Sequence, residues 1–302
     1  MGFEYQKNEL MKVCTGLISE GKVSTVIGFA PGAEGGNTAP LFMRKPEDVE
    51  AMAWDETCTP NIARYLPERR EKTGIVAKPC DARAIVMYLI EKQIERDNVF
   101  IIGMECKGMK GKDGAPAPGC DSCTVRIPPV CDVLIRLEEA GNAHDGERVR
   151  GRPKEKHDLP DCPEDRMKRF QDEINKCILC YSCRQACYGC YCKTCFMDRN
   201  IPNWLPSEID AGAKSVFHLG RAMHLAGRCV ECGACERACP SGVKIRYLIQ
   251  EINNFCRELY DYEAGMKPDE VPALAVFRQD DMEIGFLGGE GVDSCCCTKK
   301  QD

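Results

Sequence analysis

The chain has 302 residues, of which 43% are hydrophobic, as is typical of a globular protein with one large or two ordinary domains. Acidic residues outnumber basic residues by 47 to 41, and the formal charge of -6 offers no basic surface for phosphate groups, so we expect no nucleic-acid partner. No segment approaches the roughly 20 consecutive apolar residues that a membrane span needs. The charged N-terminus shows no export signal, and we expect a cytoplasmic protein without a membrane span.

Cysteine is unusually frequent, with 23 residues in the chain. In a short secreted chain this number would indicate a disulfide scaffold, but this chain is long and groups many of its thiols in tight clusters. The clustering predicts metal sites.

Three short apolar runs in the first half of the chain, residues 24–30, 74–78 and 98–104, are typical of buried strands. Between the last two runs, apolar residues recur near one helical face over residues 81–97. A strand, a helix and a strand in this order predict a parallel crossover unit. We therefore expect an α/β (α+β) N-terminal domain, residues 1–165.

The second half of the chain repeats one pattern twice. Residues 141–165 are polar and rich in glycine and proline, which is typical of a connection between domains. Helices predicted over residues 166–177 and 213–229 each lead into a dense run of cysteines. We expect a second domain over residues 166–265, followed by an irregular acidic tail, residues 266–302.

The two dense cysteine runs have identical spacing. Three cysteines at every third residue, with a fourth after four more, are the pattern of a 4Fe-4S cluster, and in paired motifs the fourth cysteine usually binds the other cluster. The predicted ligands of the first cluster are Cys177, Cys180, Cys183 and Cys239, and those of the second are Cys229, Cys232, Cys235 and Cys187. The alternative is a zinc site, but zinc usually takes two separated pairs of ligands.

The segment of residues 188–228 between the motifs is long for a compact ferredoxin hairpin and contains helical patterns, so we expect an α-helical dicluster ferredoxin domain. The same segment holds Cys190, Cys192 and Cys195. These three thiols either replace Cys187 as a ligand, bind a further metal or pack beside the clusters, and packing is the preferred interpretation.

Four cysteines of the first half are expected to meet at one edge of the sheet. Cys80 and Cys106 lie just past the carboxyl ends of consecutive parallel strands, where open α/β sheets bind ligands. Cys120 and Cys123 add a pair on a loop rich in glycine and proline, so a third 4Fe-4S cluster is predicted. The alternative is that Cys80 and Cys106 are buried small hydrophobic residues and that the loop pair binds nothing.

Three segments of the first half, "AKPCDARAI", "GMECKGM" and "CDSCTVRIPPVCDVLIR", precede the double cluster motif. In this order they resemble the β-subunit family of coenzyme F420-reducing hydrogenase and formate dehydrogenase. The chain departs from the family pattern at Cys131, where an alanine is common. The resemblance implies a flavin beside a 4Fe-4S cluster whose ligands are Cys80, Cys106, Cys120 and Cys123.

For this flavin, taken as FAD, the sequence offers a glycine-rich segment after the first strand, with Gly32, Gly35 and Gly36. Its backbone amides can approach a pyrophosphate, although it lacks the dinucleotide fingerprint, and a plain surface loop is the alternative. Lys78 and Arg83 flank Cys80 and can balance the charge of a phosphate or a cluster. Their alternative is a solvated pair.

These features predict an iron-sulfur electron-transfer subunit of an anaerobic oxidoreductase complex. We expect it to pass electrons between a flavin and a catalytic partner subunit of a hydrogenase, formate dehydrogenase or heterodisulfide reductase-like complex. The alternative is a flavin-free electron wire and docking subunit without catalysis of its own. We expect packing or surface roles for His218 and His224, and a reactive tail at residues 295–297.

Overall fold

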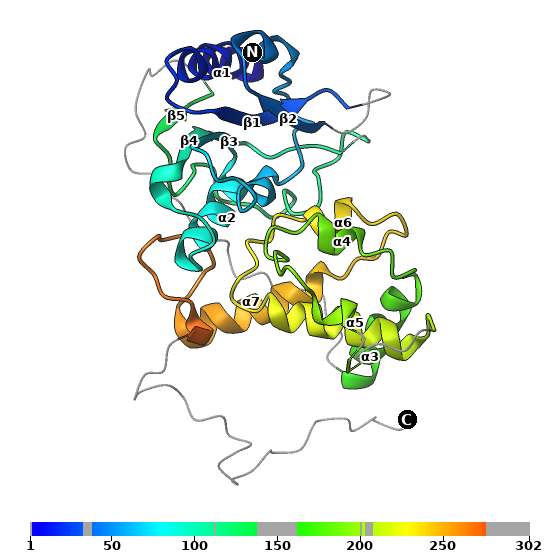
Figure 1. Ribbon diagram of the computed structural model, residues 1–302. Helices are drawn as coiled ribbons and strands as arrows, with labels where there is room; N and C mark the ends of the chain where they lie inside the picture. The colour runs from blue at the N-terminus through cyan, green and yellow to red at the C-terminus, as the bar shows by residue number, and fades with distance from the viewer. Residues whose placement is uncertain are drawn as a thin grey trace.

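The computed structural model describes residues 2–32, 38–111, 113–137, 162–199, 201–202 and 208–275. A sheet of five strands dominates the first half, and the second half contains helices packed below it (Figure 1). Among the described residues, no helix is both long and apolar enough to cross a membrane.

The sheet has the strand order β2-β1-β3-β4-β5. The strands are β1 (Thr25–Ala30), β2 (Ala39–Met43), β3 (Thr73–Ala77), β4 (Val99–Met104) and β5 (Val133–Ile135). Strands β1, β3, β4 and β5 are parallel, and β2 is an antiparallel edge strand. The three predicted strands correspond to β1, β3 and β4, whose near-continuous burial explains their unbroken apolar runs.

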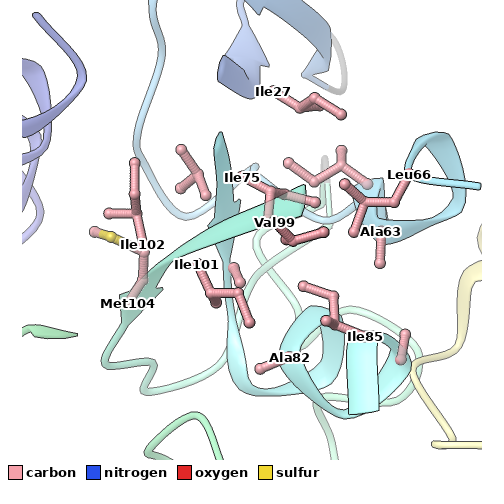
Figure 2. Close-up of a cluster of buried hydrophobic side chains, with 14 of the residues drawn as sticks. Ile27, Ala63, Leu66, Ile75, Ala82, Ile85, Val99, Ile101, Ile102 and Met104 are labelled. Carbon is pink, nitrogen blue, oxygen red and sulfur yellow. The ribbon is translucent and has the colours of Figure 1, made fainter. Parts of the chain in front are cut away.

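Helix α2 (Pro79–Ile90) connects β3 to β4 and completes the predicted crossover unit. It begins with proline at its first position, and the Asp81 carboxylate accepts a hydrogen bond from the Lys78 N–H at 3.1 Å. The helix is shorter than the predicted 81–97, because Lys92 has a left-handed backbone (φ 53°). Figure 2 shows Ile101 of β4 facing the helix, with Ile102 on the opposite side of the strand.

Helix α1 (Gly2–Ser19) covers the other face of the sheet (Figure 1). The buried amide of Gln6 donates to the carbonyl groups of Glu105 and Ile135 and accepts from the Trp54 indole. These bonds join α1 to the ends of β4 and β5. The helix and the strand β5 were not predicted from the sequence.

The regular structure described between residues 162 and 275 is helical. The α-helices are α3 (Pro163–Asn175), α4 (Ser182–Gln185), α5 (Ala211–His224), α6 (Ala234–Arg237) and α7 (Arg246–Tyr260). Short 3-10 helices are η2 (Pro46–Ala51), η3 (Ile62–Tyr65), η4 (Arg96–Asn98), η5 (Phe196–Asp198) and η6 (Ala273–Ala275). The helices predicted over 166–177 and 213–229 correspond to α3 and α5, both ending before their cysteine motifs.

The two halves of the chain meet through buried polar contacts around α2. The Arg83 guanidinium donates to the carbonyl oxygen of Ala264 at 2.8 and 3.0 Å and pairs with the Glu263 carboxylate at 3.0 Å. The Tyr88 hydroxyl donates to the carbonyl oxygen of Tyr188 at 2.7 Å. Most of the predicted connection, residues 141–161, lies outside the described residues.

Candidate metal centres

The two dense cysteine motifs share one backbone geometry. Leu179 and Glu231, two places after the first cysteine of each motif, have left-handed backbones with φ of 51° and 55°. Their N–H groups donate to the Sγ atoms of Cys177 and Cys229, at 3.3 Å in both motifs. Backbone N–H groups directed at a thiolate stabilise its charge. The duplication seen in the sequence thus extends to the backbone around the sulfur atoms.

A second left-handed residue stands four places after the first cysteine of each motif. Tyr181 (φ 61°) precedes α4 and Gly233 (φ 73°) precedes α6, and these two short helices lie side by side (Figure 1). A left-handed backbone at a residue other than glycine costs on the order of 1–3 kcal/mol, and such residues concentrate at functional sites. Three of these four left-handed positions carry a side chain, so the surrounding structure imposes the shape.

The predicted ligands of the first cluster line one pocket, which holds about 390 Å³ of empty space, part of it open to solvent. We call them the Cys177 group: Cys177, Cys180, Cys183 and Cys239. Burial raises the pKa of Cys177, and the nearby thiolates of Cys239 and Cys180 raise it further. Apolar side chains such as Phe217 and Val243 complete the wall. Cys235 of the second motif also lines the pocket, so five thiols surround a largely apolar space, and the four of the Cys177 group form a donor set that fits an iron-sulfur cluster.

The predicted ligands of the second cluster also share one neighbourhood. We call them the Cys229 group: Cys187, Cys229, Cys232 and Cys235. Burial raises the pKa of Cys229, and the Cys187 thiolate is the next cause. Burial also raises the pKa of Cys235, to which Cys187 and Cys232 contribute. Because neighbouring thiolates disfavour one another's ionisation, a positive partner such as iron is needed before all four ionise.

The four cysteines of the first half form the Cys80 group: Cys80, Cys106, Cys120 and Cys123. Burial raises the pKa of Cys106 to about 12, and the thiolates of Cys120 and Cys123 contribute to the increase. The Gly108 N–H donates to the Cys106 Sγ at 3.3 Å, a bond like those of the other two groups. Cys80 is the second residue of α2, just beyond the end of β3, and Cys106 follows β4, as predicted. The structure therefore brings these thiols together, and their role as ligands stays a prediction.

The Cys80 and Cys229 groups meet where two backbone segments touch. A Cβ atom added to Gly119 would lie 2.7 Å from the carbonyl carbon of Cys232, and one added to Gly233 would overlap the carbonyl of Pro118. The Arg237 guanidinium donates to the carbonyl oxygens of Cys232 and Thr59 at 2.6 and 2.7 Å. Glycine allows this close approach. The backbone atoms that crowd Gly233 belong to Pro118, two residues before Cys120.

The Cys229 and Cys177 groups meet beside α5. The Arg221 guanidinium is buried and donates to the Cys183 carbonyl oxygen at 3.3 Å. Burial raises the pKa of Cys183 to about 11, with the Cys235 thiolate among the further causes. Burial opposes the charge of Arg221, but the thiolates of Cys187 and Cys235 outweigh it and raise the arginine pKa. The sulfur atoms thus form one series, from the Cys80 group through the Cys229 group to the Cys177 group.

Sequence reasoning missed Arg221 and expected only a packing or surface role for His218. Both are buried, one helical turn apart on α5. Their spacing of three residues on an otherwise largely apolar helix is the signal that identifies them. His224, on the same helix, is exposed and stacks its edge on Phe196, as expected.

The residues predicted for a flavin are only partly described. Gly32 is half-buried, and Gly35 and Gly36 lie outside the described residues. The buried Lys78 ammonium binds the Asp81 carboxylate at 2.7 Å and the Pro60 carbonyl at 2.9 Å, and Arg83 is engaged by Glu263 and Ala264. Lys78 and Arg83 are therefore not a solvated pair. Their role toward a flavin stays a prediction.

The extra cysteines between the motifs differ in exposure. Cys190 is partly buried beside Cys187, which lowers its pKa to about 7, whereas Cys192 is exposed. Cys195 packs with Met197 and Phe217. The tail cysteines, residues 295–297, lie outside the described residues.

A single-ion site is not formed by the described side chains: no three of their His, Cys, Asp and Glu residues come together closely enough to hold one metal ion. This finding concerns sites of the zinc type, in which four ligands surround one ion at about 2.0–2.3 Å. In a 4Fe-4S cluster each thiolate binds a different iron atom.

Comparison with known proteins gives two curated relatives that match most of the chain. The F420-dependent formate dehydrogenase subunit beta of Methanocaldococcus jannaschii is 21% identical over an alignment that covers 87% of this chain and 92% of the relative. The F420-dependent formate dehydrogenase 1 subunit beta of Methanococcus maripaludis is 24% identical, with 85% and 90% covered. No family model matches the chain.

Among solved structures, a chain of the F420-reducing [NiFe] hydrogenase complex of Methanosarcina barkeri is 19% identical, with 34% of this chain and 39% of that chain covered. Its TM-score of 0.30 is too low to carry an argument about the fold. The alignments to the two curated relatives cover 92% and 90% of those proteins. Over most of its length the chain is therefore similar to β subunits of F420-dependent formate dehydrogenases, which agrees with the resemblance carried by its motifs.

Proposed function

We propose that this protein is an iron-sulfur electron-transfer subunit of an oxidoreductase complex. The observation that carries the proposal is the continuous series of the Cys80, Cys229 and Cys177 groups, each with four thiols and at least one backbone N–H bonded to sulfur. Three groups of four thiols fit three 4Fe-4S clusters, which supply one-electron transfer when bound. The exchange of Cys187 and Cys239 between the two motifs makes the second half an α-helical dicluster ferredoxin domain in this proposal.

The protein's own residues would hold the clusters at fixed separations and adjust their potentials. The contact of Gly119 with Cys232 fixes the separation between the Cys80 group and the Cys229 group, because backbone atoms touch backbone atoms there. The buried Arg221 places a positive charge between the outer two groups, which favours an additional electron on either side. Except for Cys180, the twelve proposed ligands are buried or partly buried, which limits the access of water to their sulfur atoms.

The outer end of the series suits contact with a partner subunit. Cys180 is exposed, and the neighbouring Ile178 is a large apolar side chain with 57% of its surface exposed. The curated relatives are named as β subunits of formate dehydrogenases. We propose a catalytic subunit of a formate dehydrogenase or hydrogenase as the partner, with a heterodisulfide reductase-type partner as a further option.

The inner end of the series would exchange electrons with FAD on the sheet domain, next to the Cys80 group.

A second candidate function is a flavin-free electron wire and docking subunit, which is favoured by the contacts of two described residues. Lys78 and Arg83, the two cations predicted to balance the charge of a phosphate or a cluster, are buried and bound to protein oxygen atoms. The fit of a flavin then depends on the glycine-rich segment alone.

Analysis of the anaerobically purified protein tests both candidates. Three clusters predict about twelve iron atoms and as many acid-labile sulfides per chain. Release of flavin by acid supports the flavoprotein. An iron content of about twelve atoms per chain without released flavin supports the electron wire. A colourless protein with zinc and no iron would refute both.

The cluster ligands are tested by Cys180→Ser and Cys232→Ser. Each variant is expected to lose or alter one low-temperature paramagnetic resonance signal of the reduced protein and up to four iron atoms per chain. Cys192→Ser is the matched control, since Cys192 is exposed and belongs to none of the three groups. Unchanged spectra and iron in both ligand variants would contradict the proposed function.

A further inference from the structure

His218 is a buried histidine without a hydrogen-bond partner in the described part of the chain. Its side chain is on α5, 3% of its surface is exposed, and neither Nδ1 nor Nε2 is paired. Buried polar side chains are nearly always hydrogen-bonded, so an unpaired imidazole needs an explanation. Its position supplies one, because His218 lines the same pocket as the Cys177 group.

The surroundings of His218 leave the pocket as the place for its hydrogen bond. Phe217 packs against it edge to face, with ring centroids 4.9 Å apart, and offers no acceptor. The Arg221 guanidinium, one turn along α5, offers only donors. Burial and this neighbouring cation lower the pKa of His218 to about 4, and in either protonation state the imidazole carries at least one N–H donor.

We propose that His218 donates this N–H hydrogen bond to the cluster held by the Cys177 group and thereby raises the reduction potential of that cluster. The inference rests on the proposed function, since it requires a cluster in the pocket. A hydrogen bond to cluster sulfur stabilises the reduced, more negative state. The effect is local, because the ring lines this pocket and the Cys80 group lies at the far end of the series.

The inference is tested with two variants at this position. His218→Phe keeps an aromatic ring and removes the N–H, whereas His218→Gln keeps an N–H donor. We expect His218→Phe to disfavour reduction of the Cys177-group cluster about tenfold, a decrease of about 59 mV for a one-electron couple. In His218→Gln, the equilibrium constant for reduction of this cluster should stay within about threefold of its value in the unchanged protein. The readout is a redox titration followed by low-temperature paramagnetic resonance, with the signal assigned from Cys180→Ser.

His224→Phe is the matched control, because His224 is an exposed histidine on the same helix and should leave the potential unchanged. If His218→Phe keeps the full iron content and the reduction potential of the Cys177-group cluster is unaltered, the inference is overturned and the proposed function stands. If His218→Phe loses iron but His218→Gln retains it, the hydrogen-bond donor role of His218 is supported. If both variants lose iron, the donor role is refuted and His218 serves to pack the helix. An unchanged protein without iron or sulfide would instead refute the proposed function.

Discussion

At the scale of single residues, the contact between Gly233 and Pro118 decides how closely the two halves of the chain approach. Gly233 has a positive φ of 73°, and the Cβ of any other residue would overlap the Pro118 carbonyl. Glycine is therefore required here for two independent reasons. The spacing of the cysteines in the sequence shows neither reason, because Pro118 belongs to the other half of the chain.

Gly233→Ala is expected to separate the Cys120 loop from the second motif. We predict a loss of more than about 2 kcal/mol of unfolding free energy, since backbone strain and a steric clash with backbone atoms add together. Chemical denaturation under anaerobic conditions measures the loss. Gly242→Ala is the control: Gly242 also has a positive φ (63°), but a Cβ there meets no atom within 4 Å. Equal losses in the two variants would show that the contact with Pro118 is not tight.

At the scale of secondary-structure elements, α2 joins the two halves of the chain. The side chains of Arg83 and Tyr88 on this helix donate hydrogen bonds to backbone carbonyl groups of the second half. From the sequence, Arg83 was a candidate for phosphate binding because it follows Cys80. The structure shows its guanidinium buried against Ala264, a contact between residues 181 positions apart that no local pattern can predict.

Arg83→Met is expected to cost about 3–5 kcal/mol of unfolding free energy, because it leaves the Glu263 carboxylate and the Ala264 carbonyl without their partner. Thermal or chemical unfolding measures this change. Lys168→Met is the control, since Lys168 forms an exposed i,i+4 pair with Asp172 at 2.6 Å and should contribute less than about 0.5 kcal/mol. A stable Arg83→Met protein that lacks only flavin would contradict the structural role and support the predicted phosphate role.

The elements that were predicted and those that were missed differ in how their residues are buried. Strands β1, β3 and β4 are almost wholly buried, so their apolar runs stand out in the sequence. Helix α1 buries Gln6 among its apolar residues, and β5 has only three residues, so neither gives a clear period. The grouping of cysteines within the two dense motifs was predictable because their spacing is local, whereas the grouping of Cys80 with Cys106 was predicted from the shared edge of neighbouring parallel strands. His218 and Arg221 were not, since their burial depends on the packing of α5 against both motifs.

At the scale of the whole molecule, apolar packing is unevenly distributed. One large core surrounds the sheet, whereas α3 and α5 belong to three small clusters, two of which include Cys177 or Cys187 as buried members. A small apolar core contributes little stability by itself. The folding of α3 and α5 is therefore expected to depend on the proposed clusters.

Removal of iron by an oxidant with a chelator is expected to unfold part of the molecule. Amide hydrogen exchange should accelerate more than about 100-fold in α3 and α5, because a ligand well above its dissociation constant contributes several kcal/mol to the folded state. Strands β1, β3 and β4 should stay protected, since their core contains no predicted ligand at its centre. Treatment with the chelator alone is the control. Retained protection of α3 and α5 after complete iron loss would refute this dependence.

The exposure of Cys180 also determines where dioxygen first reacts with the protein. Within the Cys177 group it is the most exposed thiol, while Cys187 of the adjacent group is buried. Dioxygen would reach the outer site before the inner ones. Damage is then stepwise: the colour fades in stages, and a briefly aerated sample keeps its innermost iron.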